Sequence, residues 1–446
     1  MTTVLVYGLA VAGAATVRAL RRHGNEVIVI DDTATEERRR LAEQLGVELL
    51  DRPEDPALER LVRSCDLVCP SPGVPETHAV VLAAQGAGVP LVSEIELAYR
   101  WEQERPGGPR PMLAVTGTDG KTTTTLLAVE MLRAAGVRTV DAGNTDTPLV
   151  DAIAEDLDAF VVEATSFRLA WTPSFRAEAA AWLNLAPDHL NWHRSMDTYE
   201  AAKARIWANQ RPTDVAIGFA ADDVVMRRLQ AAPGRQVSFG APGADYHRAG
   251  DVLRGPNGDI APISAMARAL PHDVTNALAA SAMVLESGLA DERAVARALS
   301  TFSGPPHRLE HVGTWDDIGW FNDSKATTPH AAAAAIRSFE RIVLIAGGYD
   351  KHVDLSPMAV DRDRVEVLIA MGATARAVTE AFEGVAERHV VDDLGAAVEL
   401  ARNVATSGST VLLSPGCASF DQYTSFEQRG DHFRTLVRAA HQEERS

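Results

Sequence analysis

Several classes of protein are excluded by what this chain has little of. Its 446 residues include three cysteines, Cys65, Cys69 and Cys417, which are too few for a disulfide framework and match no zinc-binding spacing. No stretch reaches the roughly 18 uninterrupted apolar residues that a membrane span needs. The N-terminus also lacks the basic segment and apolar core of a signal peptide. We therefore expect a cytoplasmic protein that is not inserted in a membrane.

Positive charge is also scarce. Lys and Arg total 43 against 61 Asp and Glu, which gives a formal net charge of −18. Such a chain repels nucleic acid and anionic membranes, so neither is expected as a partner. Anionic small molecules are not excluded, because a local cationic cluster can override the net charge. Hydrophobic residues at 46% and charged residues at 23% are typical of a globular protein.

Short apolar strands alternate along the chain with glycine-bearing turns and amphipathic helices. This alternation predicts an α/β fold with mostly parallel sheets covered by helices on both faces. At about 150 residues per domain, the length suggests roughly three domains. Breaks rich in proline and glycine at residues 105–111 and 303–306 would separate them. The predicted domains are residues 1–108, 109–304 and 305–446.

Residues 113–122, Leu-Ala-Val-Thr-Gly-Thr-Asp-Gly-Lys-Thr, are the most informative segment. An apolar strand enters a glycine-bearing turn, and Lys-Thr opens a helix. Backbone N–H groups of such a turn bind oxyanions, with Lys121 reaching the phosphates and the Thr122 hydroxyl ligating Mg²⁺. Val115 stands where the usual motif has its first glycine, so this is a variant phosphate loop that begins at Gly117. ATP is the expected ligand, and an incidental strand-to-helix turn is the alternative.

A second glycine-bearing turn lies near the N-terminus. Residues 8–13, Gly-Leu-Ala-Val-Ala-Gly, match a dinucleotide fingerprint at two of its three glycines. Ala10 stands at the middle position, where glycine lets a pyrophosphate approach the backbone. Asp31 and Asp32 end the next strand, where a ribose hydroxyl is bound in such folds. The pattern favours a nucleotide other than NAD, and a tight helix–sheet contact without a ligand is the alternative.

Taken together, the motifs resemble those of the Mur ligases. Residues 117–123, Gly-Thr-Asp-Gly-Lys-Thr-Thr, are similar to the family's ATP loop. Further matches follow in the family's order at residues 71–73, 143–145, 162–167, 184–190, 199–203, 307–308 and 322–327. Residues 413–423 and 426–430 are similar to those of the members that add D-glutamate. The resemblance covers essentially the whole chain.

The resemblance implies a ligase of three domains: a Rossmann-like domain for a UDP substrate, a central phosphate-loop ATPase domain and a C-terminal Rossmann-like domain for glutamate. The implied reaction adds D-glutamate to UDP-N-acetylmuramoyl-L-alanine in peptidoglycan precursor synthesis. ATP and two Mg²⁺ ions would activate the carboxylate as an acyl phosphate, and a monomer would suffice. Addition of L-glutamate and a non-catalytic binding subunit are the alternatives. A generic kinase would leave residues 419–426 without a role.

The resemblance also assigns functional residues, position by position. The implied catalytic residues are Lys121, Glu163, His189 and Lys203, and the implied metal ligands are Thr122, Glu163, His189 and Lys203. The implied ATP-binding residues are Gly117, Thr118, Asp119, Gly120, Lys121, Thr122, Thr123, Asn276, Arg308 and Asp323. The acid substrate would contact Leu9, Ala10, Asp31, Asp32, Gly73, Asn144 and Thr165, and glutamate would contact Lys325, Thr327, Lys351, Ser419 and Phe426.

Lys203 shows how far the resemblance goes beyond the residue pattern. The pattern alone reads as an ordinary solvated position on a helix. In the family this lysine carries a carbamate formed with CO₂, which orients the water shell of the metal. Reaction with CO₂ requires an uncharged amine, so the pKa of Lys203 would have to be lowered by burial or by neighbouring cations. The chain departs from the family pattern at Asp119, where Asn is common, at Asp32-Thr33 and at Asp273.

Overall fold

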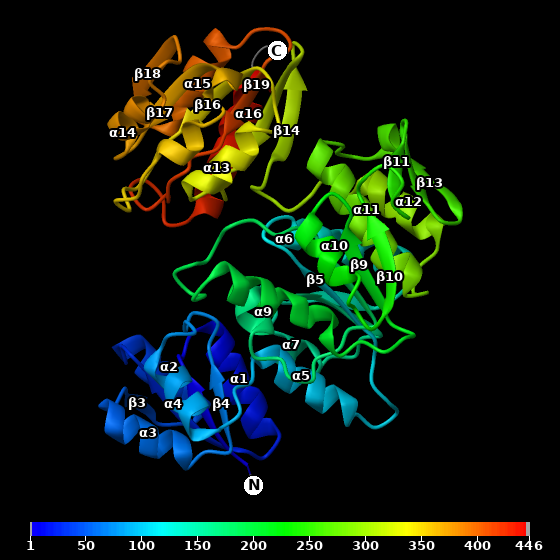
Figure 1. The fold of residues 1–446 in the computed structure, drawn as a ribbon. Coiled ribbons are helices and arrows are strands. Elements are labelled where there is room, and N and C mark those ends of the chain that lie inside the picture. The colour runs from blue at the N-terminus through cyan, green and yellow to red at the C-terminus, as the bar shows by residue number, and fades with distance from the viewer. Residues whose placement is uncertain (1, 443–446) are drawn as a thin grey trace. The chain divides into compact units, whose positions relative to one another are not determined.

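The computed structural model describes residues 2–442. Two compact units are present: the first comprises the chain up to Ala269 together with Asp273–Phe302, and the second comprises Leu270–His272 and the chain from Ser303 on. The first unit contains two parallel α/β sheets and a small antiparallel sheet, and the second contains one mixed sheet (Figure 1). The predicted α/β class is confirmed.

The N-terminal sheet has the strand order β3-β2-β1-β4, and all its strands are parallel. Its strands are β1 (Thr3–Tyr7), β2 (Glu26–Asp31), β3 (Leu49–Asp51) and β4 (Leu67–Pro70), and its helices are α1 (Val11–Arg22), α2 (Glu36–Leu45), α3 (Asp55–Arg63) and α4 (Ala79–Ala87). A Cβ added at Gly13 would lie 2.0 Å from the Gly8 carbonyl oxygen, so only glycine allows α1 to approach the turn after β1.

The central sheet has the order β10-β9-β8-β5-β7-β6, again entirely parallel. Its strands are β5 (Met112–Thr116), β6 (Thr139–Gly143), β7 (Ala159–Glu163), β8 (Ala179–Trp182), β9 (Val215–Phe219) and β10 (Arg235–Phe239). The associated helices are α5 (Glu94–Gln103), α6 (Lys121–Ala134), α7 (Leu149–Ala152), α8 (Ser166–Leu169), α9 (Met196–Ala208), α10 (Asp223–Leu229), α11 (Pro271–Glu286) and α12 (Glu292–Thr301). The apolar residues of β5, β7 and β8 are almost completely buried, as expected for a doubly covered parallel sheet.

This strand order positions the functional loops. β5 lies between β7 and β8, so the residues that follow these three strands meet at one edge of the sheet. The three-stranded antiparallel sheet, β11 (His247–Ala249), β12 (Val252–Gly255) and β13 (Gly258–Pro262), was not expected from the sequence. A one-turn 3₁₀ helix, Ile263–Ala265, follows it.

The sheet of the second unit has the order β14-β15-β19-β16-β17-β18, parallel except for the antiparallel edge strand β14. Its strands are β14 (Glu310–Trp315), β15 (Ile318–Asn322), β16 (Ile342–Ala346), β17 (Val365–Met371), β18 (Glu387–Val391) and β19 (Thr410–Leu413). Its α-helices are α13 (Pro329–Ile336), α14 (Ala375–Ala381), α15 (Leu394–Val404) and α16 (Phe426–Gln442), with 3₁₀ turns at Ser356–Ala359 and Arg362–Arg364.

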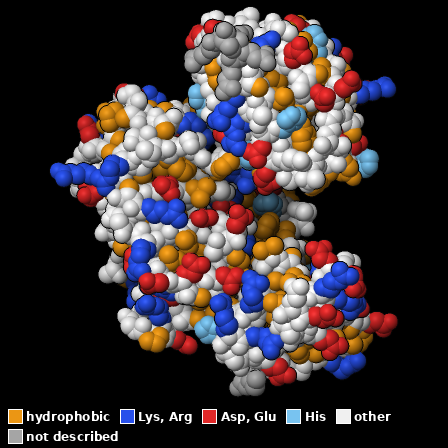
Figure 2. Space-filling model, turned by 180° about the vertical axis from the view of Figure 1, so that it is seen from behind, with side chains coloured by type: hydrophobic (Ala, Val, Ile, Leu, Met, Phe, Trp, Pro, Cys, Tyr) orange, Lys and Arg blue, Asp and Glu red, His pale blue; other side chains and the backbone are white. Residues whose placement is uncertain are grey.

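The surface carries both signs of charge despite the acidic composition. On the face in Figure 2, Lys and Arg lie interspersed with Asp and Glu, and hydrophobic side chains form small patches. Within residues 2–442, none of the helices has the length and apolar character that crossing a membrane requires.

Candidate active site

The phosphate loop follows β5 and ends where α6 begins. Gly120 precedes this helix with a φ of 82°, a left-handed conformation that favours glycine. Lys121 Nζ donates hydrogen bonds to the carbonyl oxygens of Gly117 (3.0 Å) and Thr118 (2.8 Å). The side chain of this lysine therefore folds back over the loop, and contact of its ammonium group with phosphates stays a prediction.

Asn184, just after β8, holds the loop from the other side. Its Oδ1 accepts hydrogen bonds from the backbone N–H groups of Thr118 and Asp119, both at 2.9 Å. Its Nδ2 donates to the Asp119 carbonyl oxygen at 3.2 Å. Asn184 belongs to the motif at residues 184–190 but had no predicted role. Its position after a strand adjacent to β5 was the available signal, and that adjacency is a property of the sheet.

Glu163 ends β7 and is 1% exposed. Its Oε1 accepts a hydrogen bond from Asn144 Nδ2 at 2.8 Å, whereas its Oε2 is buried with no hydrogen-bond partner among the described residues. Asn144 is held by Arg168 Nη1 at 2.8 Å. A buried carboxylate oxygen without a donor is the type of ligand that Mg²⁺ prefers. Glu163 Oε2 is therefore suited to a hard cation, for which the Thr122 hydroxyl at the start of α6 is also a predicted ligand.

Lys203 is buried rather than solvated, contrary to what the residue pattern alone indicates. It lies one helical turn after Tyr199 on α9 and is 1% exposed, with Nζ 4.6 Å from the centre of the Tyr199 ring. Its Nζ donates a 2.6 Å hydrogen bond to the Gly117 carbonyl oxygen, which also accepts from Lys121. Burial, and secondly the charge of Lys121, holds the pKa of Lys203 well below its usual value. The amine is therefore predisposed to be neutral.

His189 lies close to this pair of lysines. It has a φ of 55°, its ring contacts Phe167 edge to face at 4.7 Å, and Asp188 Oδ2 is 3.2 Å from its Nε2. Burial lowers the pKa of His189, Asp188 opposes this effect, and Lys121 and Lys203 lower the pKa further. A neutral imidazole is the form that binds a metal. Over residues 2–442, no group of three or more His, Cys, Asp and Glu side chains has the geometry of a metal site, so ligands of other types would have to contribute.

The remaining candidates for ATP lie in both units. In the first, Asn276 Oδ1 accepts from Thr124 Oγ1 at 3.3 Å, and a Cβ on Gly120 would come within 2.6 Å of the same oxygen. Asn276 therefore lies against the phosphate loop. In the second, Asp323 accepts from Leu309 N (3.2 Å) and Ser414 Oγ (2.8 Å). Arg308 is half-buried, and Thr123 is buried under the start of α6.

The predicted UDP contacts gather around the turn after β1. The Asp31 carboxylate accepts from the N–H groups of Leu9 (2.8 Å) and Thr33 (3.0 Å) and from Arg38 Nη1 (2.5 Å), so this residue supports the turn. Asp32 is half-exposed and accepts from Tyr7 Oη at 2.6 Å. Ala10 and Gly73 are exposed. Thr165, after β7, is buried, and its Oγ1 has no hydrogen-bond partner among the described residues.

The predicted glutamate contacts form two pairs in the second unit. Lys325 Nζ lies 5.4 Å from the centre of the Phe426 ring, and Lys351 Nζ is 3.4 Å from the Thr327 carbonyl oxygen. Lys325 and Lys351 are exposed, and Ser419 is 2% exposed. Two accessible ammonium groups suit a ligand with two carboxylates.

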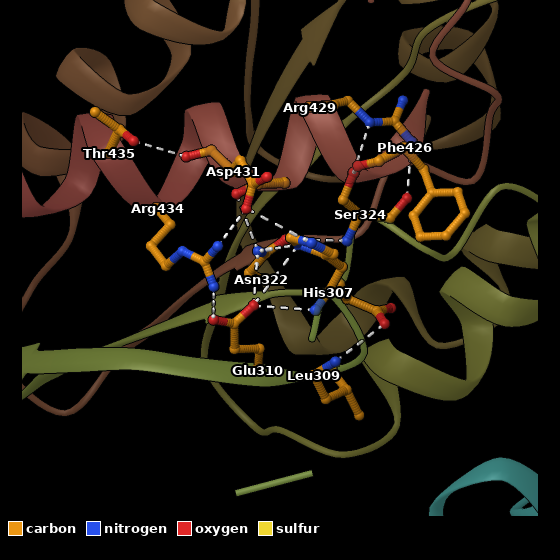
Figure 3. A network of polar contacts seen from close by, with 12 residues as sticks. His307, Leu309, Glu310, Asn322, Ser324, Phe426, Arg429, Asp431, Arg434 and Thr435 are labelled. Atoms are coloured by element: carbon orange, nitrogen blue, oxygen red, sulfur yellow. Dashed lines mark hydrogen bonds and ion pairs between the residues drawn. The ribbon is translucent and has the colours of Figure 1, made fainter. Parts of the chain in front are cut away.

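Arg429, a buried arginine without a predicted role, supports the backbone next to Lys325 and Ser419, and Figure 3 shows it beside Ser324. Arg429 Nε donates to Ser324 Oγ at 2.9 Å. Its Nη atoms donate to the carbonyl oxygens of Ser324 (2.9 Å), Cys417 (3.1 Å) and Ala418 (3.2 Å). Burial lowers the pKa of Arg429 to about 10. Because its partners directly precede Lys325 and Ser419, Arg429 fixes the backbone that carries both.

A second set of contacts in Figure 3 is centred on Asn322, at the end of β15. Its Nδ2 lies 3.0 Å from His307 Nδ1, and it donates to Glu310 Oε2 and to the Gly430 carbonyl oxygen, both at 3.1 Å. Arg434 Nη1 donates to Glu310 Oε1 at 2.7 Å. This set joins the start of the second unit to α16 and holds Asp323 at the end of β15.

Two family models match the chain: "Mur ligase middle domain" over residues 115–284, and "Mur ligase, glutamate ligase domain" over residues 307–417. The chain is 40% identical over 461 residues to a protein of Frankia casuarinae named UDP-N-acetylmuramoylalanine--D-glutamate ligase, with 98% of this chain and 94% of that protein covered. This chain belongs to the Mur ligase family. It is therefore a ligase of the ATP-dependent type that forms amide bonds.

Other Mur ligases agree in sequence or in fold. A protein of Thermobifida fusca with the same name is 37% identical over 469 residues, covering 98% of each chain. Among solved structures, the UDP-N-acetylmuramate-alanine ligase MurC of Thermotoga maritima has a TM-score of 0.58 and 18% identity, covering 99% of this chain and all of that one. The likeness to this Mur ligase structure extends the agreement in fold to the whole chain.

Proposed function

We propose that this Mur ligase adds D-glutamate to UDP-N-acetylmuramoyl-L-alanine, with conversion of ATP to ADP and phosphate. The proposal is supported by the names of relatives that are 37–40% identical over 98% of the chain. The observation that carries it is the convergence of Lys121 and Lys203 on the Gly117 carbonyl oxygen, at the sheet edge where Glu163 also ends its strand.

The chemistry follows from these groups. A carboxylate resists attack by an amine because it is negatively charged, and transfer of the γ-phosphoryl group of ATP converts it into an acyl phosphate. The loop amides and Lys121 would hold the phosphates in line with the attacking carboxylate oxygen. The glutamate amine then attacks the acyl carbon, the amide bond forms, and phosphate leaves.

Thr122, Glu163, His189 and modified Lys203 would hold two Mg²⁺ ions at this site. Bound Mg²⁺ would neutralise charge on the phosphates during transfer. Two neighbouring residues keep Glu163 in place: Asn144 donates to Glu163 Oε1, and Arg168 in turn donates to Asn144 Oδ1. Glu163 Oε2, which has no hydrogen-bond partner within residues 2–442, is the atom that would best fit the cation.

Lys203 would react with CO₂ to form a carbamate. The lone pair of its neutral amine attacks the carbon of CO₂, a C–N bond forms, and one amine proton is released. Burial and the nearby Lys121 lower the pKa of Lys203 and so favour the required neutral form. The resulting anion would offset the positive charge of Lys121 and supply oxygen ligands.

Glutamate would bind in the second unit through its two carboxylates. Lys325 and Lys351 would form charge-assisted hydrogen bonds with them, and Thr327, Ser419 and Phe426 would complete the contacts. ATP would also use Arg308, Asp323 and Asn276, and the UDP part would lie against Leu9, Ala10, Asp31, Asp32 and Gly73, with Asn144 and Thr165 nearer the reacting carboxylate. We place the enzyme in the cytoplasm as a monomer, with functional domains at 1–108, 109–304 and 305–446.

The test is phosphate release from ATP in the presence of UDP-N-acetylmuramoyl-L-alanine and either enantiomer of glutamate. Release with D-glutamate alone supports the proposal. Release with L-glutamate alone assigns the other enantiomer. Release with neither overturns it and favours a binding subunit that keeps the fold. A Lys121→Ala variant is the matched control, because it removes the phosphate-binding amine and should abolish release in every reaction.

A further inference from the structure

Three side chains from separate segments form a hydrogen-bonded chain in the first unit. His193 lies at its centre, with Nδ1 2.8 Å from Glu76 Oε1 and Nε2 2.9 Å from Ser166 Oγ. The His193 side chain is fully buried, Ser166 is 1% exposed, and the Glu76 side chain is 12% exposed. None of the three was among the predicted site residues. The arrangement joins the loop after β4 to the start of α8, three residues beyond Glu163.

The direction of each hydrogen bond follows from the chemistry of the groups. The Glu76 carboxylate only accepts, so His193 Nδ1 carries the hydrogen. With this hydrogen on Nδ1, the imidazole presents the lone pair of Nε2 to Ser166 Oγ, 2.9 Å away. The Ser166 hydroxyl must therefore donate to Nε2. Its hydrogen is thus committed, and its oxygen can accept a hydrogen bond from a ligand.

Glu76, at one end of this series of hydrogen bonds, is held by further contacts. Glu76 Oε2 accepts from Arg194 N at 3.2 Å, and Glu76 N donates to the Trp192 carbonyl oxygen at 3.2 Å. Trp192 Nε1 also donates to the Pro72 carbonyl oxygen at 2.8 Å. These contacts fasten the loop that contains Gly73, a proposed UDP contact, to the segment that contains His189. Glu76 itself is held by backbone groups of Trp192 and Arg194, so the position of its carboxylate does not depend on the Trp192 indole.

The Ser166 end adjoins residues that the proposal assigns to the reaction site. Ser166 directly follows Thr165, and its neighbour Phe167 contacts the rings of both His189 (4.7 Å) and His193 (5.8 Å). Among the described residues, His193 is the hydrogen-bond partner of Ser166 Oγ, so the lone pairs of this oxygen remain available.

We propose that Glu76 and His193 are positioning residues that orient the Ser166 hydroxyl as a fixed hydrogen-bond acceptor for the amide N–H of the acid substrate. The substrate class is an N-acylated amino acid, whose amide N–H lies next to the carboxylate that is activated. This inference rests on the proposed function, since it assigns the residues to that substrate. His193 acts through Ser166 and does not itself touch the reacting atoms.

The test is a double-mutant cycle that joins Ser166→Ala and His193→Phe. Calorimetry gives the Kd of UDP-N-acetylmuramoyl-L-alanine, and phosphate release gives kcat and the KM values of all substrates. Each single variant should weaken binding of the acid substrate about tenfold, the effect of one lost hydrogen bond. The double variant should bind no more weakly than the weaker single variant, because both changes remove the same oriented hydroxyl. The KM of ATP should not change.

Further variants separate positioning from a general loss of structure. Glu76→Gln keeps an oxygen that can accept from His193 Nδ1 and should retain near wild-type affinity for the acid substrate. Glu76→Leu lacks this oxygen and should raise Kd as much as His193→Phe does. Glu76→Leu combined with Ser166→Ala provides a second double-mutant cycle. Trp192→Phe is the control, because it removes the hydrogen bond to Pro72 but leaves the hydrogen bonds between Glu76 and His193 and between His193 and Ser166 in place. Its fold-change in Kd should therefore multiply with that of Ser166→Ala.

The outcomes are distinguishable. The proposed positioning role would be overturned if the fold-increase in Kd caused by Ser166→Ala multiplied with those caused by both His193→Phe and Glu76→Leu. If the wild-type protein binds the acid substrate but releases no phosphate, the proposed function is overturned. The double-mutant cycle measured on Kd then still tests the positioning role of Glu76 and His193. Wild-type chain that binds none of this substrate would overturn both.

Discussion

Replacement of Gly120 by alanine tests whether the phosphate loop has the conformation described. Gly120 precedes α6 with a φ of 82°, and Gly136 follows the same helix with a φ of 85°. The two glycines therefore impose nearly the same backbone strain on an alanine. They differ in their surroundings: a Cβ on Gly120 would lie 2.6 Å from Asn276 Oδ1, whereas a Cβ on Gly136 would meet no atom within 4 Å.

The size of each effect follows from this difference. A left-handed conformation costs a non-glycine residue about 1–2 kcal/mol, which both variants incur. Gly120→Ala must also displace the buried Asn276 side chain, and overpacking of this kind costs about 1–3 kcal/mol more. Since 1 kcal/mol lowers Tm by about 2–4 °C in domains of 150–250 residues, Gly120→Ala should lower Tm roughly twice as far as Gly136→Ala.

Scanning calorimetry and the KM of ATP together test whether the phosphate loop packs against Asn276 as described. Gly136→Ala should leave the KM of ATP unchanged, and Gly120→Ala should raise it, because the loop amides move. Asn276→Ala in the Gly120→Ala background should recover part of the lost Tm by removing the contacted oxygen. Equal falls in Tm for the two glycine variants, with no recovery on changing Asn276, would refute the described packing of the loop.

Further changes probe charge at the site and stability elsewhere. Glu163→Gln should reduce the rate of phosphate release by about 100-fold or more and raise the Mg²⁺ concentration needed for half-maximal rate. An unchanged Mg²⁺ requirement would contradict the role of Glu163 as a metal ligand. Lys203→Ala should lose comparable activity, and short carboxylic acids should restore part of it; undiminished activity without them would exclude an essential carbamate. Because the pKa of Lys203 is lowered on folding, wild-type stability should rise with pH between that lowered pKa and the ordinary lysine pKa of 10.5, by up to about 1.4 kcal/mol per pH unit. Calorimetry in CO₂-free buffer should show that Lys203→Met lacks this slope. Arg110→Met leaves the buried Glu102 without its 2.7 Å partner and should cost about 3–5 kcal/mol, and adding Glu102→Leu should recover much of the lost Tm.

Much of the site was predictable because it is encoded locally. A phosphate loop was predicted because strand, glycine turn, Lys121 and helix follow one another in sequence, and the structure confirms that strand, turn and helix have this order. Glu163 was placed at a strand end by the apolar run before it. The family resemblance then supplied Lys203 and the glutamate contacts, which no local pattern indicates. The structure brings Lys121 and Lys203 to one carbonyl oxygen and pairs Lys325 with Phe426 and Lys351 with Thr327.

The residues without a predicted role are those whose partners are distant in sequence. Asn184 holds a loop 65–66 residues away, Arg429 contacts Ser324 at a separation of 105 residues, and His193 contacts Glu76 at a separation of 117 residues. The local pattern around each is unremarkable. Their roles depend on which strands are neighbours and which loops are packed together.

The sequence by itself determined the α/β class and the glycine-bearing turn before α6, since these depend on periodicity and glycine placement within short segments. It also predicted the kinds of ligand from side-chain chemistry. Only the tertiary structure decided the electrostatic state of the site. Lys203 occupies a helix position that reads as solvated, but α9 packs it beneath the phosphate loop, and burial beside Lys121 lowers its pKa. The physical reason is that desolvation depends on what surrounds a group in three dimensions.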